Sequence, residues 1–298
     1  MASDQGPVVQ SAILRSELVR LRKGRGLTQQ QVAAALEWSP SKLIRVEGGG
    51  SSITKVDLDA LLSEYGVTSE STRERLQALN RGARERGWWD TYKEDVSPQY
   101  LNYVGFEAGA AFIRQFQIAV IPGLLQTTEY AEVITTVGPL DRSKVEPNIA
   151  FRHRRQLELE QRSAPPRQYH VLDEGVIRRH VGIKKDPDIM PAQLRSVADR
   201  AERDDLVTVR VIPFEAGAHP GLLDTFILLE FEGGLSDILF LDTDRGAFTM
   251  ASADDPRYAE YAEYFEELLE NALSAEESIA LMRRVAVEMS QRGTAAAR

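Results

Sequence analysis

The sequence contains no cysteine, which excludes several kinds of site at once. A chain without thiols forms no disulfide, holds no metal through thiolates and uses no cysteine nucleophile. Long apolar runs are also missing, because no stretch reaches the roughly 18 residues of a membrane-spanning helix. The first ten residues, MASDQGPVVQ, have neither the basic start nor the apolar centre of a signal peptide. We therefore expect a cytoplasmic protein.

Signatures of common enzyme classes are equally scarce. There is no glycine-rich phosphate loop, no Walker motif and no Gly-x-Ser-x-Gly elbow. His170 lies close in sequence to Asp173 and Glu174, but this spacing matches no metal-binding motif. The two adjacent carboxylates could form an acid/base pair, or they could simply cap the helical turn that follows. We favour capping, and we expect no catalytic residue, no metal, no cofactor and no enzyme activity.

Acidic residues outnumber basic ones, but unevenly along the chain. The formal net charge of −9 argues against a protein that coats nucleic acid without specificity. Residues 11–50 nevertheless hold seven Lys or Arg against three Glu, a balance of +4, and residues 1–90 hold 13 against 11, or +2. The rest of the chain therefore carries −11. A basic module on an acidic body would bind DNA through a few phosphate contacts, and its affinity would fall steeply with salt.

Residues 27–49, LTQQQVAAALEWSPSKLIRVEGG, are the most informative stretch. They predict two short helices joined by a tight corner. Thr28 is a suitable N-cap for the first helix, and Ser39 for the second, with Pro40 at the first helical position. The second helix is expected to bury three apolar side chains and to end at the glycines 48–50; the three are Leu43, Ile44 and Val46. One helix bracing a second whose start faces the major groove is the construction of a DNA-binding helix-turn-helix. An ordinary helical hairpin is the alternative.

The flanking segments complete a helical domain over residues 11–67. Residues 11–23 and 54–65 both show apolar spacing of the helical period, and Thr54 is placed to cap the latter. Its core side chains are expected to be Val56, Leu58, Leu61 and Leu62. Residues 68–90 then predict a charged linker helix, which could also contact the DNA backbone or position a dimer.

The remainder, residues 91–291, predicts an α+β domain. Strands are expected at 111–121, 168–173, 206–212, 225–231 and 237–242, with a weaker one at 246–250. Helices are expected at 97–110, 141–162 and 188–203, and two more, 256–272 and 275–291, close the chain. Ser274 and Glu277 form a capping box for the last of them. The fold class is therefore an all-α helix-turn-helix domain of four to five helices, followed by an α+β domain with a four- to five-stranded sheet and two closing helices.

Several segments recur in one order: GFEAGA at 105–110, IPGLLQTTEYA at 121–131, VLDEGVIRR at 171–179, VRVIPFEAGAHPGLLDTFILLEF at 209–231 and ALSAEESIALMRRVA at 272–286. On these segments the chain resembles actinobacterial WhiJ-like, or antitoxin-like, transcriptional regulators with an N-terminal Cro/C1 (Xre)-type domain. The resemblance implies a C-terminal domain of poorly defined function and a small partner protein encoded nearby.

Site residues follow from matching the helix-turn-helix pattern. The expected DNA-binding residues are Thr28, Gln29, Ser39, Pro40, Ser41, Lys42 and Arg45. We expect Arg45 to contact bases and Gln29 to contact phosphate. Glu47 is expected to be structural, paired with Arg15, Arg20 or Arg22.

The regulatory site is expected at two glycine- and proline-containing loops of the C-terminal domain. The residues predicted to bind a ligand or partner there are Gln126, Arg155, Gln156, Phe214 and His219. The alternative is that they only hold the core together.

These features predict a sequence-specific transcriptional regulator that binds a double-stranded DNA operator as a homodimer. Its C-terminal domain is expected to bind a small partner protein or a small-molecule effector. The alternatives are an antitoxin-like protein that neutralises a partner and regulates only itself, or a ligand-processing enzyme domain fused to a DNA-binding module. A small adjacent reading frame would favour the antitoxin-like version.

Overall fold

The computed structural model describes residues 5–137, 142–244 and 247–296. The chain forms two compact units, Met1–Asp90 with Glu232–Leu235, and Thr91–Phe231 with Ser236–Arg298. No helix in the described ranges combines the length and the apolar character needed to cross a bilayer.

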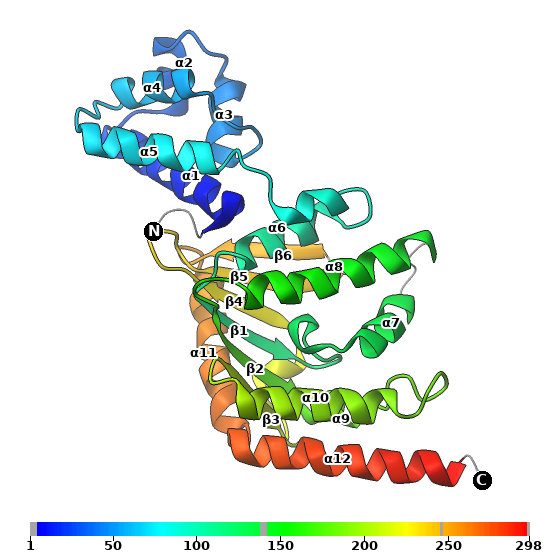
Figure 1. Ribbon diagram of the computed structural model, residues 1–298. Coiled ribbons are helices and arrows are strands. Elements are labelled where there is room, and N and C mark those ends of the chain that lie inside the picture. Colours follow the sequence, from blue (N-terminus) through cyan, green and yellow to red (C-terminus); the bar gives the residue numbers. More distant parts are fainter. Residues whose placement is uncertain (1–4, 138–141, 245–246, 297–298) are drawn as a thin grey trace. The chain divides into compact units, whose positions relative to one another are not determined.

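The N-terminal unit is all-α, as expected. Five helices lie in its described residues: α1 Gly6–Gly24, α2 Gln29–Ala35, α3 Pro40–Gly48, α4 Lys55–Glu64 and α5 Glu70–Gly82 (Figure 1). The Thr54 hydroxyl accepts a hydrogen bond from the Asp57 amide at 3.1 Å, so the predicted cap of α4 is confirmed. Leu58, Leu61 and Leu62 are buried as predicted, whereas Val56 is 77% exposed, so its predicted place in the core is wrong. The helical period places Val56 on the side of α4 opposite to Leu58, Leu61 and Leu62.

Helix α5 differs from the solvated linker that the sequence predicted. It packs against α1 and α4, and its Leu76 and Leu79 side chains are buried. The Gln77 amide also donates to the Asp59 carboxylate of α4 at 2.7 Å. Since α5 is part of the core, the N-terminal unit extends to Asp90, beyond the boundary at residue 67 that the sequence predicted.

The C-terminal unit is α+β. Its described strands are β1 Phe112–Gln117, β2 Arg167–Asp173, β3 Val207–Ile212, β4 Phe226–Glu230, β5 Ile238–Asp244 and β6 Ala247–Ser252. Its described α-helices are α6 Pro98–Glu107, α7 Thr128–Val137, α8 Arg142–Glu160, α9 Glu174–Arg178, α10 Ile189–Arg203, α11 Pro256–Asn271 and α12 Ala275–Ala296. Short 3-10 turns are η1 Trp88–Tyr92, η2 Gly123–Leu125, η3 Phe214–Ala216 and η4 Pro220–Leu222. The predicted count of four to five strands is low, because six described strands join one sheet.

The sheet has the order β3-β2-β1-β4-β5-β6. Strands β1, β2 and β3 are parallel to one another, while β4, β5 and β6 continue antiparallel. Helices α10 and α12 pack on the Val209 side of the parallel strands, and α11 packs on the opposite face against Phe226 and Leu228 (Figure 1). Strand β4 is buried on both faces, which explains why its sequence, FILLE, is apolar without alternation.

The outer edge of β3 is closed by the turn between α11 and α12. The Val211 amide donates to the Ser278 hydroxyl at 2.9 Å, and the Val211 carbonyl accepts from the Leu273 amide at 2.9 Å. Arg210 donates to the carbonyls of Ala272 and Leu273. The predicted capping box of α12 is confirmed next to these contacts, with Ser274 and Glu277 bonded reciprocally at 2.9 and 3.2 Å.

Candidate nucleic-acid interface

The corner between α2 and α3 is fixed by local hydrogen bonds. Thr28 and Gln31 form a capping box at the start of α2, with bonds of 3.2 and 2.9 Å. Glu37 adopts a φ of 55°, and the Trp38 amide donates to the Ala33 carbonyl at 2.8 Å, which turns the chain toward α3. Ser39 occupies the N-cap position of α3, but its side chain makes no capping bond, so that part of the prediction is wrong. Its exposed hydroxyl is left facing outward.

Helix α3 has one buried and one exposed face. Leu43 and Val46 are buried, whereas Pro40, Ser41 and Arg45 are exposed. Ile44, predicted to be in the core, is 52% exposed and shares the outer face with Ser41 and Arg45 at helical spacing. Because Leu43 and Val46 define the buried side, the helical period itself places Ile44 outward, and this signal was in the sequence. An exposed aliphatic group beside Arg45 suits contact with a thymine methyl.

Lys42 is already engaged within the domain. Its ammonium lies 2.8 Å from the Asp57 carboxylate of α4 and 3.8 Å from the centre of the Trp38 ring. The hydrogen bond from Lys42 lowers the pKa of Asp57. A DNA contact by Lys42 would have to compete with this ion pair, and it stays a prediction.

Glu47 is structural, as the sequence predicted, and its partner is Arg22. Two hydrogen bonds of 2.7 and 2.9 Å join the guanidinium to the carboxylate, whose side chain is 4% exposed. The hydrogen bond to Glu47 raises the pKa of Arg22. Gln29 donates to the same carboxylate at 2.8 Å, and Tyr65 donates at 3.4 Å. This centre links α1, α2, α3 and the end of α4, and it holds Gln29 at the place where its phosphate contact is predicted.

In the C-terminal unit, the loop 121–127 is held by side chains. Gln126 donates to the Ile121 carbonyl at 2.8 Å, and Gln156 donates to the carbonyls of Gly123 and Gln126 at 2.9 Å. Gln193 donates to the Leu125 carbonyl and accepts from the Thr127 amide, both at 2.7 Å. Gln126 and Gln156, predicted to bind a ligand, therefore satisfy the backbone of this loop.

Arg155, also a predicted ligand contact, lies in a buried cluster between α8 and α6. Its Nε donates to Glu107 at 2.6 Å, and its Nη2 donates to the same carboxylate. Its Nη1 and Nη2 also donate to the hydroxyls of Tyr100 and Tyr103, at 2.7 and 3.1 Å. Burial opposes the charge of Arg155, but Glu107 more than offsets it, and the pKa of Arg155 lies well above its usual range. This arginine is a structural ion-pair partner.

Phe214 and His219 lie beside the junction of β2 and α9. His219 is buried, with its Nε2 3.4 Å from the Asp173 carboxylate and its ring against Phe116. Asp173 caps α9 through the Gly175 amide at 2.7 Å, and Glu174 accepts from the Phe214 amide at 2.7 Å. The capping role favoured for this carboxylate pair is therefore confirmed for Asp173. The contacts of Phe214 and His219 are separate from those of Gln126, Arg155 and Gln156, and only Phe214 is exposed.

His170 lies apart from Asp173 and Glu174. It is buried in the middle of β2, and burial lowers the pKa of its imidazole to about 3. It is therefore neutral near pH 7.

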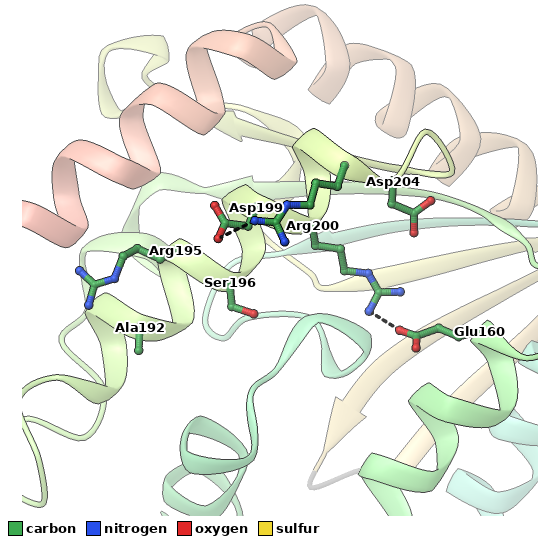
Figure 2. Close-up of a pocket in the computed structure, with 8 residues that line it drawn as sticks. Glu160, Ala192, Arg195, Ser196, Asp199, Arg200 and Asp204 are labelled. Carbon is green, nitrogen blue, oxygen red and sulfur yellow. Dashed lines mark ion pairs between the residues drawn. The ribbon is translucent and has the colours of Figure 1, made fainter.

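A groove of about 730 Å³ lies between the outer face of α10 and the end of α8 (Figure 2). One ion pair crosses the groove and joins Arg200 of α10 to Glu160 of α8 at 2.7 Å. A second pair, Arg203 and Asp199 at 3.9 Å, lies along α10. With Arg195 and Asp204, the lining holds three arginines and three carboxylates. This balanced lining selects neither an anion nor a cation.

We expect Gln126→Ala to lower the free energy of unfolding of the C-terminal unit by about 1–3 kcal/mol, because the buried Ile121 carbonyl loses its donor. Thr128→Ala, at an exposed neighbouring position, is the matched control. Chemical denaturation followed by circular dichroism measures the difference. Equal midpoints for the two variants would contradict a structural role for Gln126.

Comparison with known proteins gave two family matches. The model described as Domain of unknown function (DUF5753) matches residues 100–284, and the model described as Helix-turn-helix domain matches residues 13–76. The second match reaches into α5, in agreement with the packing of that helix. Searches of curated proteins and of solved structures gave no significant match.

Proposed function

Since the chain belongs to the family of the model Domain of unknown function (DUF5753) and carries a helix-turn-helix domain ahead of it, we propose that it is a sequence-specific DNA-binding transcriptional regulator. The exposed face of α3 carries this proposal. Ser41, Ile44 and Arg45 project outward at i, i+3 and i+4 spacing, while Leu43 and Val46 anchor the helix below. Arg45 can donate two hydrogen bonds to a guanine, and Ile44 can contact a thymine methyl.

We expect Arg45→Ala to reduce discrimination between a selected site and the same site with the contacted guanine replaced. A bidentate contact to guanine contributes about 1–3 kcal/mol, so the affinity ratio should fall by about 5- to 150-fold. Selection from random duplexes, followed by footprinting on the protein's own upstream region, supplies the site. Arg81→Ala removes the same charge from an exposed position of α5 and should leave the ratio unchanged. An unchanged ratio in Arg45→Ala would remove Arg45 from base recognition.

The active form in this proposal is a homodimer on two half-sites, because a single small module makes few contacts. Size-exclusion chromatography with light scattering tests it, with an expected mass of twice 33.3 kDa. A protein that stays monomeric at the concentrations used for footprinting, both alone and on its DNA site, would contradict the proposed homodimer.

The C-terminal unit is the regulatory part in this proposal, and it binds a small partner protein or an effector. Support comes from the resemblance to WhiJ-like, antitoxin-like regulators and from the loop 213–225. This loop exposes Phe214, Leu222 and Leu223, the last of them 82% exposed, and several large exposed apolar side chains in one loop favour an interaction surface. Co-purification with the product of an adjacent small reading frame is the test. Capture of that product that persists when Leu222 and Leu223 are replaced by serine would place the contact elsewhere.

A further inference from the structure

Arg15 of α1 carries a charge that is not compensated within the described part of the chain. Its guanidinium lies over Gly49, where a Cβ atom would come within 1.5 Å of Nη1. Gly49 has a φ of +81° at the C-cap of α3, so a glycine is required here for conformation and for space. Burial lowers the pKa of Arg15, and no described carboxylate or hydrogen-bond acceptor offsets this effect. Structural arginines usually have a partner, as Arg22 has in Glu47.

The Arg15 side chain lines a pocket of about 190 Å³ between α1, the segment after α3, and α5. Its polar lining consists of Ser11, Arg15, Ser51, Ser52, Asn80 and Arg84. Asn80, which is only 4% exposed, also lines this pocket. Its amide can donate a hydrogen bond to a polar occupant.

The side chains that line the pocket determine which charge an occupant should carry. Two guanidinium groups, three hydroxyls and one amide can donate hydrogen bonds, and none of the lining residues, all of them described, is a carboxylate. A cation would be repelled, and a neutral molecule would leave two charges unbalanced. An oxyanion accepts from all of these donors, and arginine matches phosphate geometry especially well.

We propose that this pocket binds a phosphate group. The phosphate can come from the backbone of bound DNA or from free phosphate in solution. The DNA source rests on the proposed function, because Ser51 and Ser52 follow directly after the recognition helix and Gly50 packs against the Arg45 side chain. The free source does not depend on it.

The first experiment titrates inorganic phosphate against chloride at constant ionic strength and follows thermal unfolding of the full chain by tryptophan emission. All three tryptophans, Trp38, Trp88 and Trp89, lie in residues 1–90, so the signal reports on the unit that holds the pocket. Phosphate should raise the midpoint of the wild type and of Arg81→Gln, a control on α5 whose side chain does not line the pocket. It should not raise that of Arg15→Gln or Arg84→Gln.

The second experiment measures DNA affinity against salt for the same proteins. Loss of one phosphate contact should lower the slope of log K against log salt by about 0.9 in Arg15→Gln, with no change in Arg81→Gln. A lower slope identifies DNA as the source; a phosphate-dependent midpoint with an unchanged slope identifies free phosphate. If the wild type binds no DNA, the proposed function fails, but the first experiment still shows whether the pocket binds phosphate.

Should Arg15→Gln not fold, Ser51→Ala/Ser52→Ala replaces it in the first experiment, because these two side chains are exposed. Arg84→Gln replaces it in the second, because the salt slope responds to the loss of a cationic side chain and Arg84 is exposed. The proposal is overturned if phosphate does not alter the wild-type midpoint and the salt slope is the same in all variants.

Discussion

Arg155→Met should lower the free energy of unfolding of the C-terminal unit by about 3–5 kcal/mol, because it leaves the Glu107 carboxylate buried without its partner. Glu107 is 1% exposed, so its charge is largely shielded from solvent. The hydroxyls of Tyr100 and Tyr103 also lose the guanidinium that donates to them. The Tyr103 hydroxyl still donates to Glu107 at 2.6 Å, but the carboxylate loses the only positive charge that is bonded to it among the described residues.

The measurement is denaturation followed by far-ultraviolet circular dichroism, with tryptophan emission as an internal reference for residues 1–90. Arg154→Met is the matched control, since the neighbouring arginine pairs with Glu158 on the helix surface, where such pairs contribute about 0–1 kcal/mol. The double variant Arg155→Met/Glu107→Leu should recover most of the loss. Equal unfolding curves for Arg155→Met and Arg154→Met would refute the structural role of Arg155.

Glu47→Ala should lower the free energy of unfolding of the N-terminal unit by about 3–5 kcal/mol. DNA binding should be lost at temperatures at which the variant is unfolded and the wild type is still folded. The carboxylate accepts from Arg22, Gln29 and Tyr65, so its removal leaves the mostly buried Arg22 charge uncompensated. Thermal unfolding of the full chain by tryptophan emission is the appropriate measurement. A fragment ending at residue 67 is unsuitable, because it would lack the buried Leu76 and Leu79 of α5.

Glu74→Ala, at an exposed position of α5, removes the same charge from the same unit and should leave the midpoint unchanged. The opposite pattern, an unchanged midpoint with tighter DNA binding in Glu47→Ala, would show that Glu47 faces the phosphates. The two roles can be told apart because a stabilising carboxylate changes the unfolding midpoint, whereas a carboxylate that repels phosphate changes the DNA affinity.

Local order was predictable from the sequence, whereas pairing over long distances was not. The caps at Thr28, Thr54 and Ser274 lie where short-range hydrogen bonding requires them. The segments that became strands were recognisable by their β-branched and aromatic content. Their order in the sheet was not, because β1, β2 and β3 are separated in sequence by helices, and alternation alone does not specify which strand pairs with which.

The candidate sites show the same limit. The outer face of α3 follows from the helical period, and only Ile44 was assigned to the wrong side. Gln126 was recognised as a polar residue among apolar neighbours, and Arg155 and Gln156 as possible sources of polar contacts, but the sequence could not tell ligand contact from internal contact. That distinction depends on the backbone groups of loop 121–127 and on Glu107, distant in sequence from Arg155.

The closed edge of β3 has a consequence for shortened forms of this protein. The segment 272–278 satisfies the outward backbone groups of Val211. A product that stops before residue 272 would present an unpaired strand edge, ready to accept a strand from another copy. Incomplete chains would therefore tend to aggregate and to be removed by proteases.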